Sequence, residues 1–421
     1  MENKPEISEL GEVFDVNPSR VIKRGEVTPF IPMEALPEHS REVSRVYYRE
    51  YSGSGTRFKN GDTLIARITP CLENGKTVYI SCLAENVVAH GSTEYIVLSG
   101  KQDVSENLYG YYLARSPDFR AYAIAHMEGT SGRQRVPASA VENYRISLPP
   151  LPEQRTIAEV LGSLDDKIAL NRRMNQTLEA LARAIFKSWF IDLEPVRAKM
   201  EGRAPAGMDA KMAALFPDAM DGDVPSGWRK ESLDQIAHFL NGLALQKYPP
   251  TGDEFLPVIK IAQLRTENTD GADKASASIM KEYIIENGDI LFSWSGSLDV
   301  VIWCGGKGAL NQHLFKVTSE KYPKWFYYYW ILRHLQDFQA IAAGKATTMG
   351  HIQRHHLSEA KVIVPDTDLL REMDRAIAPL LEKIILNKLE SNTLANLRDT
   401  LLPKLLNREV TVDNIDLQSG L

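Results

Sequence analysis

The sequence predicts a mixed α/β fold built from two similar α/β domains, each followed by one long helix, and we expect the two helices to pair as an antiparallel coiled coil. Three observations lead to this prediction. Matching segments recur in the same order in the two halves of the chain. Each half ends in a long amphipathic stretch with a heptad pattern. Short strand-like runs separated by turn residues precede each stretch.

Composition sets the broad class. A chain of 421 residues predicts two to three domains, and a net charge of -6 means that any nucleic-acid surface must be local. The three cysteines, Cys71, Cys82 and Cys304, are odd in number and widely spaced, which argues against a disulfide framework or a zinc site and favours the reducing cytoplasm. The polar start argues against a signal peptide. Because no run of about 20 apolar residues occurs, no transmembrane helix and no membrane partner are expected.

The internal repeat can be followed through short identical segments. KIALN at 167–171 recurs as KIILN at 383–387, an offset of 216. Asn-Gly-Asp at 60–62 recurs at 287–289, an offset of 227, and IPMEAL from Ile31 resembles IKIAQL from Ile259. Because the order is kept while the offset changes, the halves are expected to share a fold and to differ by loop insertions.

The α/β parts combine strand-like and helical runs. The Asn-Gly-Asp tripeptides supply turn chemistry beside the strands. We expect helices over 106–127 and 324–343. The expected strands are 63–68, 77–83, 94–99, 289–294, 300–304 and 313–318. The predicted organisation is an α/β domain (1–150), a spacer helix (151–192), a linker (193–224), a second α/β domain (225–364), a second spacer helix (365–407) and a tail (408–421).

Both long stretches carry an a/d heptad seam, which calls for a partner seam. Three prolines at 149, 150 and 152 stop regular structure just before the first stretch, and Pro152 suits the first helical turn. Asp366 or Thr367 can cap the second helix. An antiparallel pair is favoured because the linker then need not cross back about 60 Å. The alternative is that each helix packs on its own domain as ordinary core.

Polar residues interrupt the seam at the same register in both helices. Asn171 and Asn387 are expected to set the alignment of the helices, or else to lie exposed at a gap. The residues predicted to pair the helices are Leu161, Leu164, Ile168, Asn171, Leu178, Ile185, Ile377, Leu380, Ile384, Asn387, Leu394 and Leu401.

The stretch LPPLPEQRTIAEVLGSLDDKIALNRRMNQTLEALARAIFKSWF, with PVRAKMEGR and PSGWRKESLDQIA after it, resembles the specificity subunit of type I DNA restriction-modification systems. The resemblance implies two target-recognition domains that each read one half of a gapped, bipartite double-stranded DNA target. It implies paired helices that set the gap and dock two methyltransferase subunits, joined by restriction (translocase/endonuclease) subunits. No cofactor is then expected in this chain, and S-adenosylmethionine, ATP and Mg are expected on the partners.

One departure concerns the second helix. It begins VPDTDLLREM, lacks the Pro-Leu-Pro-Glu-Gln start of the first, and carries Arg398 in its seam. The second joint is therefore expected to be looser.

Candidate DNA-binding residues follow from side-chain chemistry, because Arg, Gln, Asn, Ser and Thr read base edges and Lys and Arg bind phosphates. Two loops align between the halves, TSGRQRV (130–136) and ATTMGHIQRHH (346–356). For each candidate the alternative is a solvated loop or core packing. The predicted set is Arg67, Lys76, Arg133, Gln134, Arg135, Trp294, Ser295, Gln312, His313, Thr347, Thr348, His351, Gln353 and Arg354.

Catalytic motifs are not evident. CGGKGAL (304–310) lacks the spacing of a phosphate-binding loop, and PDTD (365–368) lacks the partner residues of a nuclease site. Three histidines, His351, His355 and His356, could suggest a metal site. A solvated or DNA-facing role is favoured for them, because no Cys or carboxylate cluster joins them. A non-catalytic DNA-reading subunit is therefore favoured. The alternatives are an assembly scaffold with degenerate recognition domains and a stand-alone DNA-modifying enzyme.

Overall fold

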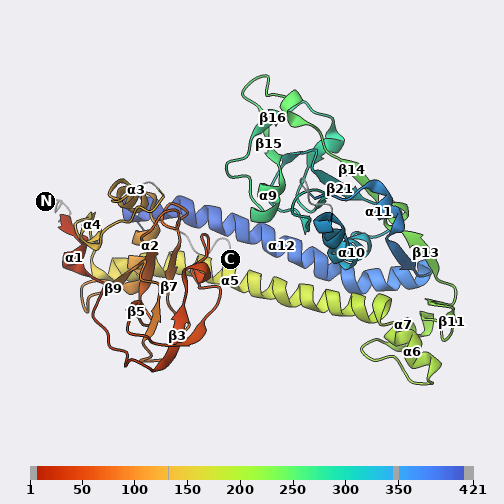
Figure 1. The fold of residues 1–421 in the computed structure, drawn as a ribbon, viewed down its shortest axis with the longest axis horizontal. Coiled ribbons are helices and arrows are strands. Elements are labelled where there is room, and N and C mark those ends of the chain that lie inside the picture. The colour runs from red at the N-terminus through yellow and green to blue at the C-terminus, as the bar shows by residue number, and fades with distance from the viewer. Residues whose placement is uncertain (1–6, 131, 345–349, 412–421) are drawn as a thin grey trace. The chain divides into compact units, whose positions relative to one another are not determined.

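The computed structural model describes residues 7–130, 132–344 and 350–411. The chain divides into two compact units, residues 1–169 with 393–421 and residues 170–392. Each unit holds one α/β domain together with part of both long helices, α5 (Leu151–Phe186) and α12 (Thr367–Leu406) (Figure 1). No helix in the described part of the chain is long and apolar enough to cross a membrane.

The first unit contains two four-stranded sheets and a two-stranded ribbon. One sheet has the order β2-β9-β6-β7 and is antiparallel throughout, whereas β4-β3-β8-β5 contains one parallel pair, β3 with β8. The ribbon joins β1 to β10. The strands are β1 (Ile7–Glu9), β2 (Phe14–Val16), β3 (Val27–Ile31), β4 (Tyr47–Glu50), β5 (Thr56–Phe58), β6 (Thr63–Ala66), β7 (Thr77–Tyr79), β8 (Ala89–Gly91), β9 (Tyr95–Gly100) and β10 (Arg145–Ser147). The helices of this domain are α1 (Leu10–Val13), α2 (Asn107–Arg115), α3 (Pro117–Ala125) and α4 (Ala138–Glu142).

The second unit repeats this topology strand for strand. Its sheets have the orders β14-β21-β18-β19 and β16-β15-β20-β17, the parallel pair is β15 with β20, and the ribbon is β13 with β22. The strands are β13 (Arg229–Ser232), β14 (His238–Asn241), β15 (Phe255–Ile259), β16 (Lys274–Ser276), β17 (Ile284–Ile285), β18 (Ile290–Ser293), β19 (Val300–Ile302), β20 (Gly308–Leu310), β21 (Leu314–Thr318) and β22 (Lys361–Val364). The helices are α8 (Leu233–Ile236), α9 (Ile261–Thr266), α10 (Lys324–Gly344) and α11 (Arg354–Glu359).

The repeat extends to individual turns. Gly61 and Gly288 have φ of 89° and 87°, a left-handed conformation that favours glycine. The aspartate after each glycine accepts a backbone N–H three residues before it: Asp62 from Lys59 at 2.7 Å, and Asp289 from Glu286 at 2.8 Å. The internal duplication predicted from short matching segments is therefore confirmed at the level of backbone geometry.

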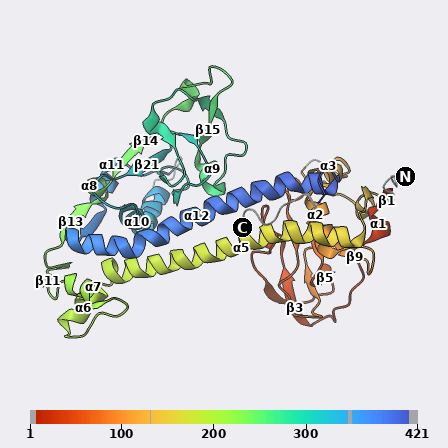
Figure 2. The ribbon, with the colours of Figure 1, turned by 180° about the vertical axis from the view of Figure 1, so that it is seen from behind.

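The two long helices pair side by side and run in opposite directions, as predicted (Figures 1 and 2). In the first unit Leu164 and Ile168 of α5 pack against Leu394 of α12. In the second unit the Asn171 amide donates to Glu390 at 2.8 Å and the Asn175 amide donates to the carbonyl of Ile384 at 3.1 Å. Within this unit residue numbers thus rise along α5 as they fall along α12, which defines an antiparallel pair.

Helix starts also follow local chemistry. Pro152 lies in the first turn of α5, where its missing N–H costs nothing. The Asp366 carboxylate accepts the N–H groups of Asp368 and Leu369, each at 3.0 Å, and so caps α12.

One segment differs from the sequence prediction. The single helix expected over 106–127 is two helices, α2 and α3, because Pro117 lacks an N–H and Ser116 caps α3 by accepting the N–H of Phe119 at 3.2 Å. The predicted linker contains short elements of its own: α6 (Glu194–Met200), α7 (Ala210–Leu215) and β11 (Met220–Asp221), which pairs with β12 (Val224–Pro225). Buried Val196 and Phe216 anchor these elements in the core of the second unit.

Candidate nucleic-acid interface

In the first unit, the predicted loop lies against the end of the central strand β6. Arg135 pairs with Ile68, just beyond β6. The N–H of Val136 donates to the carbonyl of Arg67 at 2.9 Å, and the N–H of Thr69 donates to the carbonyl of Gln134 at 3.0 Å. The loop thereby brings the predicted residues at 133–135 next to Arg67.

The second unit makes the same connection with different side chains. His351 pairs with Ser295, just beyond β18, and the N–H of Ile352 donates to the carbonyl of Trp294 at 3.0 Å. In the first unit the backbone N–H of Arg67 donates to the carbonyl of Glu94 at 3.0 Å. The equivalent bond in the second unit runs from the N–H of Trp294 to the carbonyl of His313 at 3.3 Å. The two predicted regions therefore occupy equivalent positions in the repeat.

An ion pair anchors the loop of the first unit. The Nε and Nη2 atoms of Arg135 donate to the Glu94 carboxylate at 2.7–2.9 Å, and its Nη1 donates to the carbonyl of Arg133 at 3.0 Å. The bond to Glu94 raises the pKa of Arg135, which keeps the guanidinium charged. Arg135 is thus held by protein groups and positions the loop, whereas the side chain of Arg133 is exposed.

The other candidates of the first unit differ in availability. Gln134 is half-buried. Arg67 is half-buried beside the loop, and its Nε atom has no hydrogen-bond partner among the described residues. The ammonium group of Lys76 lies 3.4 Å from the carbonyl of Met33.

In the second unit the equivalent position holds an aromatic and histidine cluster. The indole N–H of Trp294 donates to Asn241 Oδ1 at 3.0 Å and to the carbonyl of Gln312 at 3.2 Å. The centre of the Trp294 ring lies 6.1 Å from the centre of the His313 ring and 6.3 Å from the centre of the His351 ring. Trp294 is therefore fixed by hydrogen bonds through its indole N–H and contacts two histidine rings.

Neighbouring predicted residues support or flank this cluster. Ser295 is buried, and its hydroxyl lies 2.9 Å from His313 Nδ1, which favours a positioning role for the serine. The guanidinium of Arg354, an exposed residue, lies 5.9 Å from the centre of the Phe315 ring. Gln353 is the N-cap residue of α11. Thr347 and Thr348, also predicted to contact DNA, lie outside the described residues.

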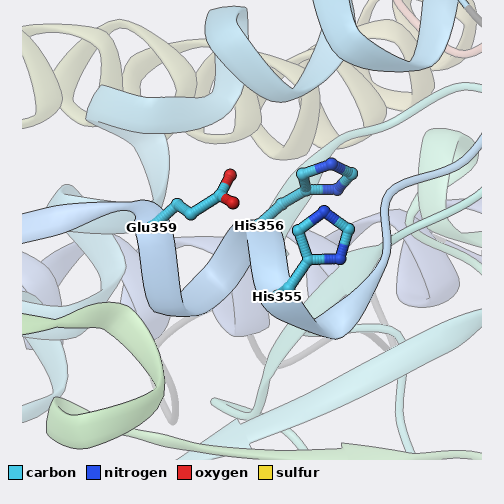
Figure 3. A group of neighbouring side chains, drawn as sticks. All are labelled: His355, His356 and Glu359. Atoms are coloured by element: carbon cyan, nitrogen blue, oxygen red, sulfur yellow. The ribbon is translucent and has the colours of Figure 1, made fainter.

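The structure places the Glu359 carboxylate beside two of the three predicted histidines, all on α11. His355, His356 and Glu359 place one possible ligand atom each within 4.8 Å of one another (Figure 3). However, Nδ1 of the buried His356 accepts the backbone N–H of Gln353 at 2.9 Å. A neutral ring with Nδ1 as acceptor carries its proton on Nε2, so a metal could bind His356 only at the expense of this cap. The geometry favours a structural role for His356.

The predicted helix-pairing residues fall into three groups. The apolar residues Leu161, Leu164, Ile168, Ile377, Ile384 and Leu394 are buried. Leu178, Ile185, Leu380 and Leu401 are half-buried. Asn171 and Asn387 are 1% exposed and bonded across the pair: the Asn171 amide donates to Glu390 at 2.8 Å, and the Asn387 amide donates to Asn175 at 2.8 Å. Solvent exposure at a gap, the alternative for the two asparagines, does not describe them.

Sequence reasoning missed several residues. Glu94 was not singled out, because nothing near it in sequence announces Arg135 as its partner. The exposed edge formed by β4 carries Tyr48, 74% exposed, and Arg49 lies 5.1 Å from the ring centre of Phe30. Lys274 of β16 lies 4.0 Å from the ring centre of Phe255 on the equivalent edge. Alternating aromatic and basic residues in SRVYYREY (44–51) were the available signal.

Comparison with known proteins decides the family. The model of the type I restriction modification DNA specificity domain matches residues 2–180 and again residues 225–398. The chain belongs to this specificity-domain family. Two matches that together span most of the chain agree with the duplicated fold of the specificity-domain protein described above.

Relatives of this specificity-domain protein include the type I restriction enzyme HindI specificity subunit of Haemophilus influenzae. The two are 26% identical over 426 residues, which cover 88% of this chain and 90% of the relative. The EcoAI specificity subunit of Escherichia coli is 34% identical over 152 residues, or 35% of this chain and 26% of the relative. The crystal structure of an S subunit from M. genitalium shares the fold, with a TM-score of 0.56 at 16% identity, covering 96% of this chain and 97% of that one.

Proposed function

We propose that this chain is the non-catalytic specificity subunit of a type I restriction-modification complex and reads a gapped, two-part DNA target. The observation that carries the proposal is the repeated loop at the end of β6 and β18. The backbone connection is the same in both units, while Arg67, Glu94 and Arg135 of the first unit are Trp294, His313 and His351 in the second. Two surfaces with one geometry and different side chains suit two unlike half-sites.

Base reading in the first unit is assigned to Arg133 and Gln134. An arginine can donate two parallel bonds to guanine, and a glutamine can donate one bond to adenine N7 while accepting one from its N6 amino group, which makes these types effective readers of the major groove. Arg135 and Glu94 hold the loop in place, and Arg67 lies beside it with an unused buried donor. An ordered loop reduces the entropy lost on binding.

In the second unit the proposal assigns base contact to His351 and Arg354, supported by the rigid Trp294. The exposed cations Arg49 of β4 and Lys274 of β16, each beside an aromatic ring of the next strand, suit the sugar-phosphate backbone. Lys and Arg neutralise phosphates, so the affinity for DNA then falls with salt. Specificity and affinity would thus come from different residues of each domain.

The proposal also assigns docking of partner subunits to the outer faces of the long helices. Leu170 and Leu181 of α5 are 46% and 48% exposed, and eleven residues, or about three turns, place them on one face. Leu386 and Leu397 of α12 repeat them at the offset of 216 and are 60% and 46% exposed. The same exposed leucines on both helices suit two copies of one partner, the methyltransferase subunit.

Catalysis then belongs to the partners. The proposal places S-adenosylmethionine on the methyltransferase subunits, and ATP and Mg on the restriction subunits. This chain contributes the choice of site and positions a partner over the target base.

The function is tested by co-expressing the chain with methyltransferase subunits and mapping methylated positions in the host DNA. A gapped two-part motif is expected. Arg133→Ala with Gln134→Ala should relax one half of it, and His351→Ala with Arg354→Ala the other half. Arg203→Ala, in an exposed loop outside both sites, is the matched control. A contiguous motif, or two variants that relax the same half, would refute the assignment.

The docking surface is tested separately by native mass spectrometry of the complex. Leu170→Gln with Leu181→Gln should remove one methyltransferase copy, the Leu386→Gln and Leu397→Gln pair the other, and all four changes both. The exposed Gln176→Ala on the same helix serves as the control. Full binding of two copies by the fourfold variant would place the docking surface elsewhere.

A further inference from the structure

A buried ion pair joins α5 to α12 in the first unit. Nη1 of Arg398 donates to Oδ1 of Asp165 at 2.5 Å, and the two side chains are 6% and 5% exposed. The hydroxyl of Tyr112, from α2, donates to Oδ2 of the same aspartate at 2.7 Å. Burial alone would lower the pKa of Arg398, but Asp399 and Asp165 together raise it.

The repeat offers a comparison for this pair. At the offset of 216, Asp165 corresponds to Leu381, and Arg398 corresponds to Ala182. Leu381 and Ala182 are buried in the second unit, 3% and 0% exposed. The position that is ionic in the first unit is therefore apolar in the second.

The asparagine positions behave in the opposite way. Asn171 corresponds to Asn387 at the same offset, so each helix presents the same residue to the pair. A polar node of this kind fixes the register of two helices but cannot distinguish one helix from the other. Register and choice of partner are thus carried by different residues.

The distinction matters because two similar helices can pair in more than one way. If α5 of one copy paired with α5 of another in the same register, Asp165 would face Ala182. If two copies of α12 paired, Arg398 would face Leu381. A pair of α5 helices would bury two Asp165 carboxylates without Arg398. A pair of α12 helices would bury two Arg398 guanidinium groups that keep only Asp399, a 58% exposed neighbour on their own helix. Burying a charge after removal of its buried partner is strongly destabilising.

We propose that the Asp165–Arg398 pair makes helix pairing heterotypic, selecting the second half of the chain as the partner of the first half over a second copy of either half. The ion pair selects among partners and adds little to the free energy of unfolding, because well-packed apolar residues can replace a buried ion pair with little or no loss of stability. The proposal is independent of DNA recognition and of the docking surface.

The test uses the folded chain with a protease site placed in the exposed loop 203–206, between the two halves. Two differently isotope-labelled preparations are cleaved in the folded state, mixed in denaturant and refolded. Native mass spectrometry then counts heterotypic and homotypic dimers. Random assortment would make homotypic dimers as abundant as heterotypic ones, whereas we expect the wild type to hold them at least about tenfold lower.

The decisive variant is Asp165→Leu with Arg398→Ala, which copies the apolar pair of the second unit. It should fold, and its homotypic dimers should rise toward the random proportion. A wild type that assorts randomly, or a double variant that keeps the wild-type bias, would overturn the proposal.

An uncleaved version guards against halves that fail to refold. The intact double variant should form dimers in which α5 pairs with α5 and α12 with α12, and its dimer fraction should rise with concentration above that of the wild type in light scattering. Equal dimer fractions in the two proteins would also overturn the proposal.

Discussion

The seam between α5 and α12 can be tested by comparing two positions on one helix. Ile168 is 4% exposed and packs with Leu164 and Leu394, whereas Leu170, two residues further along α5, is 46% exposed. We consider Ile168→Ala and Leu170→Ala, which remove the same number of carbon atoms from the same helix. The coiled-coil geometry predicts very different effects on the free energy of unfolding.

The magnitude follows from burial. Ile168→Ala removes three buried carbons, worth about 2.4 kcal/mol at about 0.8 kcal/mol each. The cavity left behind adds to this, so the expected loss is about 3 kcal/mol within the usual range of about 2–5 kcal/mol. At Leu170 about half of the side chain already faces water, and its cavity opens to solvent, so the loss should be about 1 kcal/mol or less.

Amide hydrogen exchange followed by mass spectrometry suits this comparison, because a chain with two compact units need not unfold in one step. The peptides to follow are those of α12 over 393–406, in the unit of Ile168, and those over 384–392, in the unit of Leu170. Protection there should fall by about two orders of magnitude in Ile168→Ala and by at most about fivefold in Leu170→Ala. Equal losses in the two variants would refute the pairing of this face of α5 with α12.

Three further predictions concern the α/β domains. His356→Ala removes the acceptor for the N–H of Gln353 and should lower the free energy of unfolding in urea by about 1 kcal/mol. His355→Ala, at an exposed position, should leave it unchanged. Zinc or a chelator should leave the melting temperature unchanged. Gly61→Ala and Gly288→Ala each place a side chain at positive φ and should cost about 1–2 kcal/mol in the same assay; an unchanged urea midpoint in either would contradict the matching turns. Burial, with Arg49 nearby, lowers the pKa of His90, so the unfolded chain takes up a proton first as the pH falls. His90 thus contributes stability that is present above about pH 6.5 and lost below it, toward the lower folded pKa, and His90→Gln should flatten the loss of urea midpoint between pH 7 and pH 5.

The helix pair could be predicted from sequence because its cause is local and periodic. Heptad spacing identifies the buried face without any knowledge of the partner, and the matching KIALN and KIILN segments supply the partner. The two loops were found for a related reason. Their positions are tied to the repeat, so aligning the two halves of the sequence is enough to locate both.

What could not be predicted depends on contacts between distant residues. Asp165 sits in a Leu-Asp-Asp-Lys stretch that is typical of a solvated helix face, and its partners in the structure, Tyr112 and Arg398, lie 53 and 233 residues away along the chain. Glu94 gains its role from Arg135 in the same way. The break between α2 and α3 is different, since Ser116 and Pro117 were visible signals that the apolar pattern of 106–127 outweighed.

Equivalent positions in the two halves can be compared to separate residues that maintain the shared fold from residues that differ between the halves. Where both halves must obey the same geometry, the residues agree: glycines at 61 and 288 in the turns, and asparagines at 171 and 387 in the seam. Where the halves must differ, the backbone bonds are kept and the side chains change. Glu94 against His313 is one example.

Asp165 and Arg398 belong with the positions that differ, although they lie in the long helices and not in the loops proposed to read DNA. Two domains can read different half-sites only if one of each is present. A duplicated protein that diversified its reading loops while keeping symmetric helices would gain nothing if two first halves could pair equally well. In our proposal the ionic position breaks that symmetry in the helices, so that a difference between the two proposed reading loops can be used.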